Sequence, residues 1–155
     1  MPDVHDRATR SRNMAAVRGR DTKPELIIRK GLHAAGLRYR LHVKDLPGKP
    51  DLVFPKHRAA MFVHGCFWHG HACALFTLPV TRAEFWQEKI AGNISRDESA
   101  ATRLHELGWR VAVVWECALR GRDRLSLTDV LDELASWIRS DAARLSIAGS
   151  GAAPG

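Results

Sequence analysis

The sequence has no apolar run that approaches the roughly 20 residues required for a membrane-spanning helix. Its first ten residues, MPDVHDRATR, lack the apolar segment of a secretory signal. It has only three cysteines, an odd number, and two of them lie among histidines, which in a reducing compartment favours metal or thiol chemistry over disulfides. These absences predict a cytoplasmic protein that has no membrane partner.

Acidic residues are fewer than basic ones, 17 against 24, so the 155-residue chain carries a net charge of +7. A small basic domain attracts phosphate backbones or anionic membranes, and the missing membrane segment makes nucleic acid the default partner. We divide the chain into a basic arm at residues 1–20, one domain at residues 21–140 and a small, Gly-rich tail at residues 141–155 that we expect to be disordered. The arm is either a solvated segment or, as the net charge favours, a segment that lies on DNA.

Hydrophobic periodicity predicts an α/β or α+β domain around a mixed sheet, with the element order α-β-β-β-α-α-β-α. The first helix has Thr22 as its N-cap and Glu25 three residues later, as in a capping box, and it ends at Gly36. The next strands include two short apolar runs that are expected to form a hairpin. The expected elements after the first helix are strands at 37–43, 51–54, 59–65 and 109–116, and helices at 81–93, 95–108 and 127–139.

The stretch VHGCFWHGHAC concentrates three histidines, two cysteines and two aromatic residues in one loop. Cys66, Cys73, a histidine of this loop and Cys117, which follows the strongest predicted strand, offer a Cys3His set of the kind found in structural zinc sites. Soft thiolates and imidazole select zinc over hard cations. The alternative is that Cys117 is simply a buried small apolar residue. These residues by themselves leave open whether His69 or His71 is the ligand.

The stretch GKPDLVF places an acidic residue after proline at the start of a short strand, which is how many nucleases present a carboxylate to Mg²⁺. Asp51 is the candidate, with Glu25 as an outer partner. Each also has a purely structural reading, Asp51 as a turn cap and Glu25 as part of its capping box. The next strand, AAMFVHG, lacks the second carboxylate and the lysine of the common nuclease pattern. It offers His64 instead, and a histidine can act as a general acid or base near neutral pH.

Three of the five tryptophans fall on predicted core stripes, whereas Trp68 and Trp86 do not, and each of these two follows a phenylalanine. Phe67 and Trp68 belong to a polar loop, so we expect them to be exposed. Exposed paired aromatic rings on a basic protein suit stacking on bases or wedging between base steps. Packing as a small satellite core is the alternative, and it is equally favoured for Trp86.

From about residue 3 to residue 125 the chain resembles the very-short-patch repair (Vsr) DNA mismatch endonucleases, a branch of the restriction-endonuclease-like superfamily. Long specific strings carry the resemblance: DVHDRATRSRNM, LPGKPDLVF, HGCFWHGHAC, TRAEFWQEKIAGN, RLHELGWRV and VWECALRGR. The resemblance implies a restriction-endonuclease-like mixed sheet flanked by helices, with one structural zinc site. It also implies a monomer that nicks one strand of double-stranded DNA on the 5′ side of the T in a T:G mismatch, which arises when 5-methylcytosine deaminates. Such nicking starts very short patch repair, with mismatch-repair proteins as further partners.

The resemblance also implies a role for each residue that matches the family's motifs. Asp51 would bind catalytic Mg²⁺, Val63 would reach the same ion through its backbone carbonyl, and Glu25 would reach it through water. His69 would be the catalytic base, His64 a second active-site histidine, and Asp97 would orient one of the two. The zinc ligands would be Cys66, His71, Cys73 and Cys117, and the DNA-binding residues Met14, Phe67, Trp68, Trp86, Lys89 and Asn93.

Two positions depart from the family pattern. Several members have threonine at the position of Val63, and one family version reads HHHHC where this chain reads HGHAC, so that Gly70 replaces a histidine. Two other functions compete with strict T:G nicking: a nickase with relaxed mismatch or sequence preference, and a zinc-stabilised DNA-binding module that does not cleave. The second rival does not require Glu25, Asp51, His64 and His69 to occur together.

Overall fold

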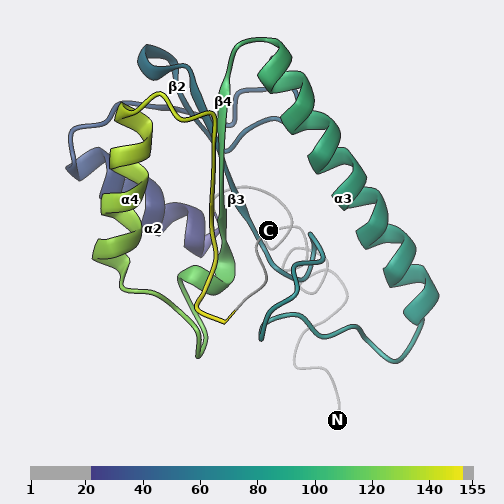
Figure 1. Ribbon diagram of the computed structural model, residues 1–155. Coiled ribbons are helices and arrows are strands. Elements are labelled where there is room, and N and C mark those ends of the chain that lie inside the picture. Colours follow the sequence, from purple (N-terminus) through teal and green to yellow (C-terminus); the bar gives the residue numbers. More distant parts are fainter. Residues whose placement is uncertain (1–21, 152–155) are drawn as a thin grey trace, which may run out of the picture.

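The computed structural model describes residues 22–151, and a mixed sheet of five strands runs through the middle of this part of the chain (Figure 1). The strands lie side by side in the order β1 (Arg40–Leu41), β2 (Leu52–Phe54), β3 (Ala59–His64), β4 (Arg110–Trp115) and β5 (Arg144–Ile147). Neighbours among β1, β2 and β3 pair antiparallel, and neighbours among β3, β4 and β5 pair parallel. The predicted hairpin is confirmed, because β2 pairs with β3 across the short 3₁₀ helix η1 (Pro55–His57).

Helices cover both faces of this sheet. α2 (Lys23–Ala34) and α4 (Leu127–Arg139) lie on one face, and α3 (Ala83–Glu106) lies on the other (Figure 1). Because β2 is covered on both faces, it is buried at all of its positions instead of alternating. The expected fold, a restriction-endonuclease-like mixed sheet flanked by helices, is confirmed. Among residues 22–151, none of the helices combines the length and apolarity that crossing a bilayer requires.

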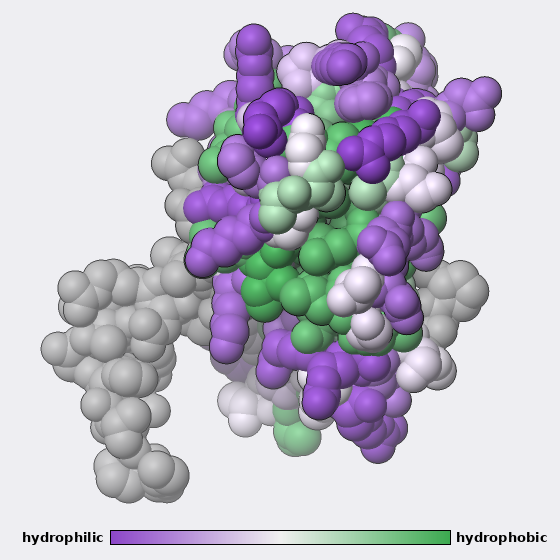
Figure 2. All heavy atoms as spheres, turned by 90° about the vertical axis from the view of Figure 1, so that its left-hand side faces the viewer, coloured by the Kyte–Doolittle hydropathy of each residue, from purple (hydrophilic) through white to green (hydrophobic). Residues whose placement is uncertain are grey.

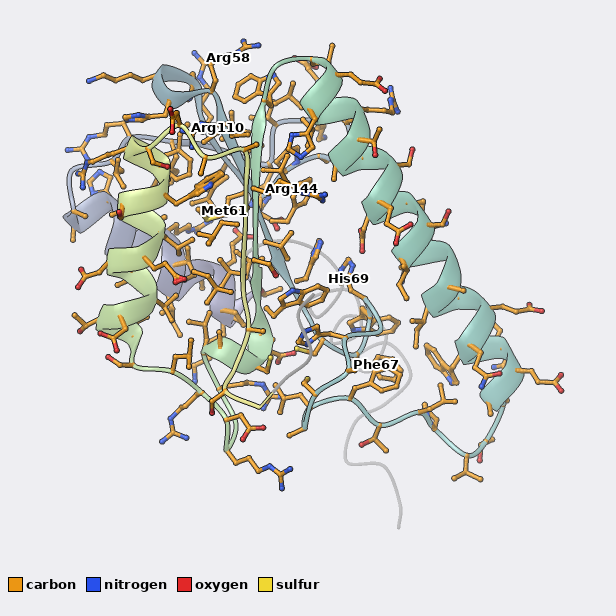
Figure 3. The ribbon with its side chains drawn as sticks, in the orientation of Figure 1. Arg58, Met61, Phe67, His69, Arg110 and Arg144 are labelled. Carbon is orange, nitrogen blue, oxygen red and sulfur yellow. The ribbon has the colours of Figure 1, made fainter. Side chains whose placement is uncertain are left out.

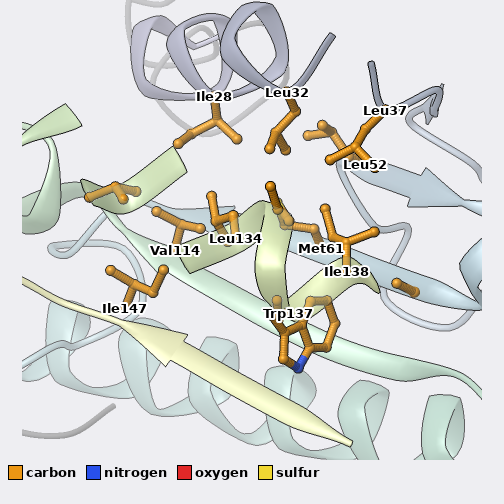
Figure 4. Packing of buried hydrophobic residues seen from close by; sticks show 14 of the residues in the cluster. Ile28, Leu32, Leu37, Leu52, Met61, Val114, Leu134, Trp137, Ile138 and Ile147 are labelled. Carbon is orange, nitrogen blue, oxygen red and sulfur yellow. The ribbon is translucent and has the colours of Figure 1, made fainter. Parts of the chain in front are cut away.

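The larger core lies between the sheet and the pair α2–α4 (Figure 4). Ile28 and Leu32 of α2 meet Leu134 and Ile138 of α4, and all four side chains have 0% exposed surface. The helical stripe of α4 predicts this packing, and the helix has the predicted bounds. On the outer side of these helices, apolar side chains are visible amid a ring of hydrophilic ones (Figure 2). The larger core includes Leu52 and Phe54 of β2, so it packs against the strand that follows the candidate site residue Asp51.

α3 corrects the predicted division into two helices. The expected helices at 81–93 and 95–108 are one continuous helix of 24 residues that begins at Ala83, with no side-chain cap at Arg82. Ser95 is a good N-cap residue, but an interior glycine or polar residue costs a helix only about 1 kcal/mol. Burial of Ile90 on one side of the expected break and of Leu104 on the other outweighs that cost.

The tail at 141–155, expected to be disordered, is ordered where it can be described. Residues 144–147 form β5, which pairs with β4 from Val111↔Arg144 to Val114↔Ile147. Ile147 is buried in the larger core. The composition of the tail is small and Gly-rich, but the free edge of β4 satisfies the backbone groups of a strand, and this pairing is not visible in local sequence. The division of the chain at residues 20 and 140 otherwise stays a prediction.

Candidate functional site

The register of β3 and β4 brings two distant loops together. The strands are parallel, with His64 opposite Trp115, so both chains leave the sheet at the same edge. Cys66 and Cys117 each lie two residues beyond those partners and meet there: the backbone N–H of Cys117 donates to Sγ of Cys66 at 3.4 Å. The pairing of a parallel strand, rather than closeness in sequence, therefore positions Cys117 beside the loop.

Four side chains at this edge form a cluster that could hold a metal ion. One potential ligand atom from each of them lies within 4.8 Å of the others, in the set Cys66, His71, Cys73 and Cys117. Sγ of Cys117 is 3.6 Å from Nδ1 of His71. In a tetrahedral zinc site with ordinary bond lengths, sulfur and nitrogen ligands are separated by about 3.6 Å. The donor set and this spacing therefore fit zinc.

The thiols of this cluster are poorly solvated. Burial raises the pKa of both Cys66 and Cys117 above the ordinary value of 9.0, so neither thiol ionises readily without a cation. A bound dication reverses that balance, because it stabilises thiolates directly. The cluster is thus better suited to holding a cation than to nucleophilic thiol chemistry.

A second cluster forms where the hairpin begins. Glu25 of α2, His42 after β1 and Asp51 before β2 bring potential ligand atoms within 4.8 Å of one another. Glu25 is only 1% exposed, and its Oε2 lies 3.2 Å from Nε2 of His42 and 3.2 Å from Nη1 of Arg29. Two oxygen donors and an imidazole around one point suit a divalent cation.

The Asp51 carboxylate is oriented by the neighbouring strand. The backbone N–H of Val63 donates to Oδ2 of Asp51 at 2.8 Å. Burial raises the pKa of Asp51 from 3.8 to about 6, the Val63 N–H opposes this rise, and the negative charge of Glu25 adds to it. Two neighbouring carboxylates that repel each other are stabilised when a cation lies between them, so this pair could hold a metal ion.

A third cluster joins the loop to α3. Nδ1 of His69 lies 2.5 Å from Oδ2 of Asp97, and the rings of His64 and His69 stack with centroids 3.7 Å apart. In the tautomer that donates from Nδ1 to Asp97, Nε2 of His69 is the nitrogen that can accept a proton. His64 is 8% exposed, and burial lowers its pKa to about 3, so its ring is neutral at pH 7.

The second and third clusters face one cleft of about 390 Å³. Asp51 and Val63 line it from the hairpin, and His64, His69 and Asp97 line it from the loop and α3. Basic side chains complete its rim, namely His42, Lys44 and Lys49. A cleft that combines the Asp51 carboxylate, an imidazole oriented by Asp97 and two lysines can bind a phosphate group and move a proton at it.

The loop aromatics pack edge to face against Trp86 in the N-terminal part of α3. Phe67 and His69 lie between the lower end of the sheet and α3 in Figure 3. The ring of Trp68 contacts Phe67 at 5.1 Å and Trp86 at 5.6 Å between centroids. Trp68 is 6% exposed, so the expectation that it is exposed is wrong; α3 supplies an aromatic partner that local sequence does not reveal. Phe67 and Trp86 are half-buried.

The remaining predicted DNA-binding residues fall on the same helix or outside the described residues. Lys89 and Asn93 are half-buried on α3, four positions apart. The side-chain amide of Asn93 donates to the backbone carbonyl of Trp68 at 2.8 Å, which ties the loop to the helix. Met14 and the basic arm at 1–20 lie outside the described residues, so their predicted contacts stay predictions.

The substitution at Gly70 has a local explanation. Its φ is +63°, a conformation that favours glycine, and an added Cβ would lie 2.7 Å from Ile90 and 2.8 Å from Ile94 of α3. The glycine lets the loop pass close to α3 between His69 and His71. Those two histidines consequently point to different clusters, His69 to Asp97 and His71 to the cysteines.

Sequence reasoning missed His42 and the lysines of the cleft. His42 follows a strand of only two residues and has φ of +50°, a left-handed conformation that nothing in the alternating pattern LRYRLHV indicates. The pattern only places His42 at a polar position next to the end of the expected strand. Lys49 likewise has a positive φ, 51°, within the stretch PGKPD.

The site pairs two carboxylates, one from α2 and one just before β2, with an oriented histidine in the loop after β3. On a mixed sheet flanked by helices, this arrangement is typical of a nuclease of the restriction-endonuclease-like class. A family model described as DNA mismatch endonuclease Vsr matches residues 2–75. The DNA mismatch endonuclease Vsr of Escherichia coli (strain K12) is 50% identical over 147 residues, which cover 95% of this chain and 94% of that protein.

Two further relatives are type II nicking enzymes. V.XorIIP of Xanthomonas oryzae pv. oryzae is 50% identical over 121 residues, which cover 77% of this chain and 89% of that enzyme. V.NmeAIP of Neisseria meningitidis serogroup A is 42% identical over 122 residues, which cover 79% of this chain and 87% of that enzyme. The chain belongs to the Vsr family of DNA mismatch endonucleases.

Proposed function

We propose that this protein is a Mg²⁺-dependent endonuclease that nicks one DNA strand on the 5′ side of the T in a T:G mismatch and so starts very short patch repair. The observation that carries the proposal is the single cleft in which Asp51 and the His69–Asp97 pair meet. A binding module needs neither group. The names of the relatives, a mismatch endonuclease and nicking enzymes, support the same activity class.

The carboxylates of Asp51 and Glu25 would hold the catalytic ion, with His42 beside them. Bound Mg²⁺ would supply Lewis-acid stabilisation of the charge that develops on the scissile phosphate and on the leaving 3′ oxygen. Asp51 is held for this by the Val63 N–H, and Glu25 by Arg29. Lys44 and Lys49 at the rim would attract the phosphate backbone.

His69 would take a proton from the attacking water through Nε2. Asp97 holds the other ring nitrogen, which fixes the tautomer and stabilises the imidazolium that forms. Water attack at phosphorus with loss of the 3′ oxygen produces a 5′-phosphate and a 3′-hydroxyl. The neutral ring of His64 stacks on His69 and limits its rotation. The proton-accepting group is therefore oriented before DNA arrives.

The cluster of Cys66, His71, Cys73 and Cys117 would hold structural Zn²⁺, which performs no chemistry in this proposal. Its role is to order the loop from which Phe67, Trp68 and His69 project. Trp68 is buried against Trp86 in the free protein. Insertion of Phe67, Trp68 and Trp86 beside a mismatch would therefore require these edge-to-face ring contacts to break. Unstacking of DNA is least costly where pairing is already poor.

The deciding experiment is a single-turnover nicking assay on end-labelled duplexes in Mg²⁺ buffer. One duplex contains T:G, and the others contain other mismatches, normal pairs or different flanking bases. We expect the wild type to nick the T-bearing strand of the T:G duplex and Asp51→Ala to bind without nicking. Asp45→Ala is the control and should resemble the wild type, because Asp45 is an exposed acidic residue of the connection between β1 and β2.

If the wild type and Asp51→Ala both bind and neither nicks, the endonuclease proposal is wrong and the zinc-stabilised binding module replaces it. Equal nicking of several mismatches would replace strict T:G choice by the relaxed nickase.

A further inference from the structure

Trp115, the last residue of β4, lies between the loop's metal cluster and its histidine pair. Its ring stacks on the ring of His71, with centroids 4.2 Å apart and planes at 12°. It also contacts His64 at 5.3 Å and His69 at 6.3 Å between centroids. One indole therefore touches a candidate zinc ligand and both candidate catalytic histidines.

The Trp115 ring is held in place from β5. Its Nε1–H donates to Oγ of Ser146 at 3.2 Å, and the backbone of Ser146 is paired with Val113 of β4. The indole is 7% exposed, so its orientation is set by this bond and by the stacked rings rather than by solvent. Simple core packing would be served by a phenylalanine, which has no N–H to place.

The end of β5 reaches the metal cluster as well. The N–H of Gly149 donates to Sγ of Cys117 at 3.2 Å, and an added Cβ at Gly149 would lie 2.5 Å from the Cys117 carbonyl oxygen. Ala148 packs against the same cluster. Residues 146–149 thus contact the cluster at one end and the indole between the clusters at the other, although they lie in a segment whose composition indicates only a tail.

We propose that Trp115, oriented by Ser146 of β5, is a positioning residue that aligns His64 and His69 with the cleft and couples their alignment to the ordered metal loop. This inference rests on the proposed nicking function. The mechanism is steric. The His64 ring stacks on His69 and restricts its rotation, and the Trp115 ring contacts His64 and restricts its movement in turn. Displacement of a reacting group by about 1 Å costs roughly a hundredfold in rate, so even a small tilt of these rings should be measurable.

The test compares Trp115→Phe, Ser146→Ala and the double variant with two controls. Trp109→Phe alters another tryptophan of the same sheet face, which packs under Arg58 instead of near the loop. Ser150→Ala alters a serine just beyond the contact segment. For each protein we would measure zinc per chain, the Kd for the T:G duplex and the single-turnover nicking rate constant.

We expect Ser146→Ala to lower the rate constant about three- to tenfold, the usual effect of one lost hydrogen bond, with zinc content and Kd unchanged. Trp115→Phe should lower it about tenfold or more, and the double variant no further than Trp115→Phe, because the shared bond is already absent. Both controls should stay within twofold of the wild type. Ser146 is exposed, so its variant should fold even if Trp115→Phe does not.

The proposal is overturned if Ser146→Ala nicks at the wild-type rate, or if the effects of the two substitutions multiply. A purely structural role would reduce stability or zinc content and leave the rate constant of the folded protein unchanged. If the wild type does not nick at all, the proposed function has failed, and the positioning claim is then judged by the ring-proton NMR signals of His64, His69 and His71. Those signals should shift in Ser146→Ala and not in Ser150→Ala; unmoved signals overturn it.

Discussion

Replacement of Asp51 by asparagine should abolish nicking and, at neutral pH, stabilise the magnesium-free protein. The carboxylate is buried beside Glu25, and its pKa is raised from 3.8 to about 6, mainly by that burial. Asparagine removes the charge and keeps an oxygen that can accept the Val63 N–H. The substitution therefore removes the electrostatic cost and leaves the hydrogen bond in place.

The magnitude follows from the difference between the folded and unfolded pKa values. The folded protein binds the Asp51 proton more tightly than the unfolded chain does. The stability that this protonation contributes is therefore fully present below pH 3.8 and is lost as the pH rises through about 6. A shift of about two units corresponds to about 3 kcal/mol at pH 8. The difference in free energy of unfolding between Asp51→Asn and the wild type should therefore grow by about 1 to 2 kcal/mol from pH 5 to pH 8.

Urea unfolding at pH 5, 6, 7 and 8 in magnesium-free buffer measures this difference, with zinc left in place and Asp45→Asn as the control. Asp45 is exposed and lies outside the Glu25–His42–Asp51 cluster, so Asp45→Asn should unfold at the same urea concentration as the wild type. Addition of Mg²⁺ at pH 8 should stabilise the wild type and not Asp51→Asn, because only a protein that binds the ion when folded gains stability from it. A gap that is the same at pH 5 and pH 8 would refute the burial argument.

Three further outcomes follow from the site and the core. His71→Ala should lose zinc and lower the free energy of unfolding, whereas His69→Ala should retain zinc and lose nicking; elemental analysis that shows the reverse would exchange the two roles. Gly149→Ala should lower both stability and zinc retention, because its Cβ would lie 2.5 Å from the Cys117 carbonyl oxygen; unaltered zinc release on heating would show that the backbone can shift. Leu134→Ala should cost about 2–5 kcal/mol in urea unfolding, since the side chain is fully buried in the larger core, and a cost below 1 kcal/mol would mean that the core refills the cavity.

Several elements could be predicted from sequence because their signals are local. Thr22 caps α2 and accepts the N–H of Glu25, as the capping box indicates. The hydrophobic period of α4 predicts its bounds, and the two short apolar runs predict the hairpin. In each case the residues that decide the structure lie within a few positions of one another, so propensity and periodicity act on the same segment.

The predictions that were wrong concern features of the fold that depend on contacts with segments distant in the sequence. Continuity of α3 depends on burial of Ile90 and Leu104 against other elements, and β5 exists because β4 offers it an edge. Trp68 is buried because Trp86 and α3 lie over it. Local composition carries no information about such partners, and each contact outweighs an unfavourable or neutral secondary-structure propensity of the segment.

The sequence by itself determined the inventory of chemistry: a loop rich in histidine and cysteine, a carboxylate after Pro50, basic charge and, through the resemblance, the family. Tertiary structure alone decided which of these side chains come together in each cluster. Parallel register brings Cys117 to Cys66, the left-handed turn at Gly70 sends His69 and His71 to different clusters, and β5 supplies Ser146 to Trp115. The physical reason is that reactivity requires atoms a few ångströms apart, and in a folded chain strand pairing sets that proximity across dozens of residues.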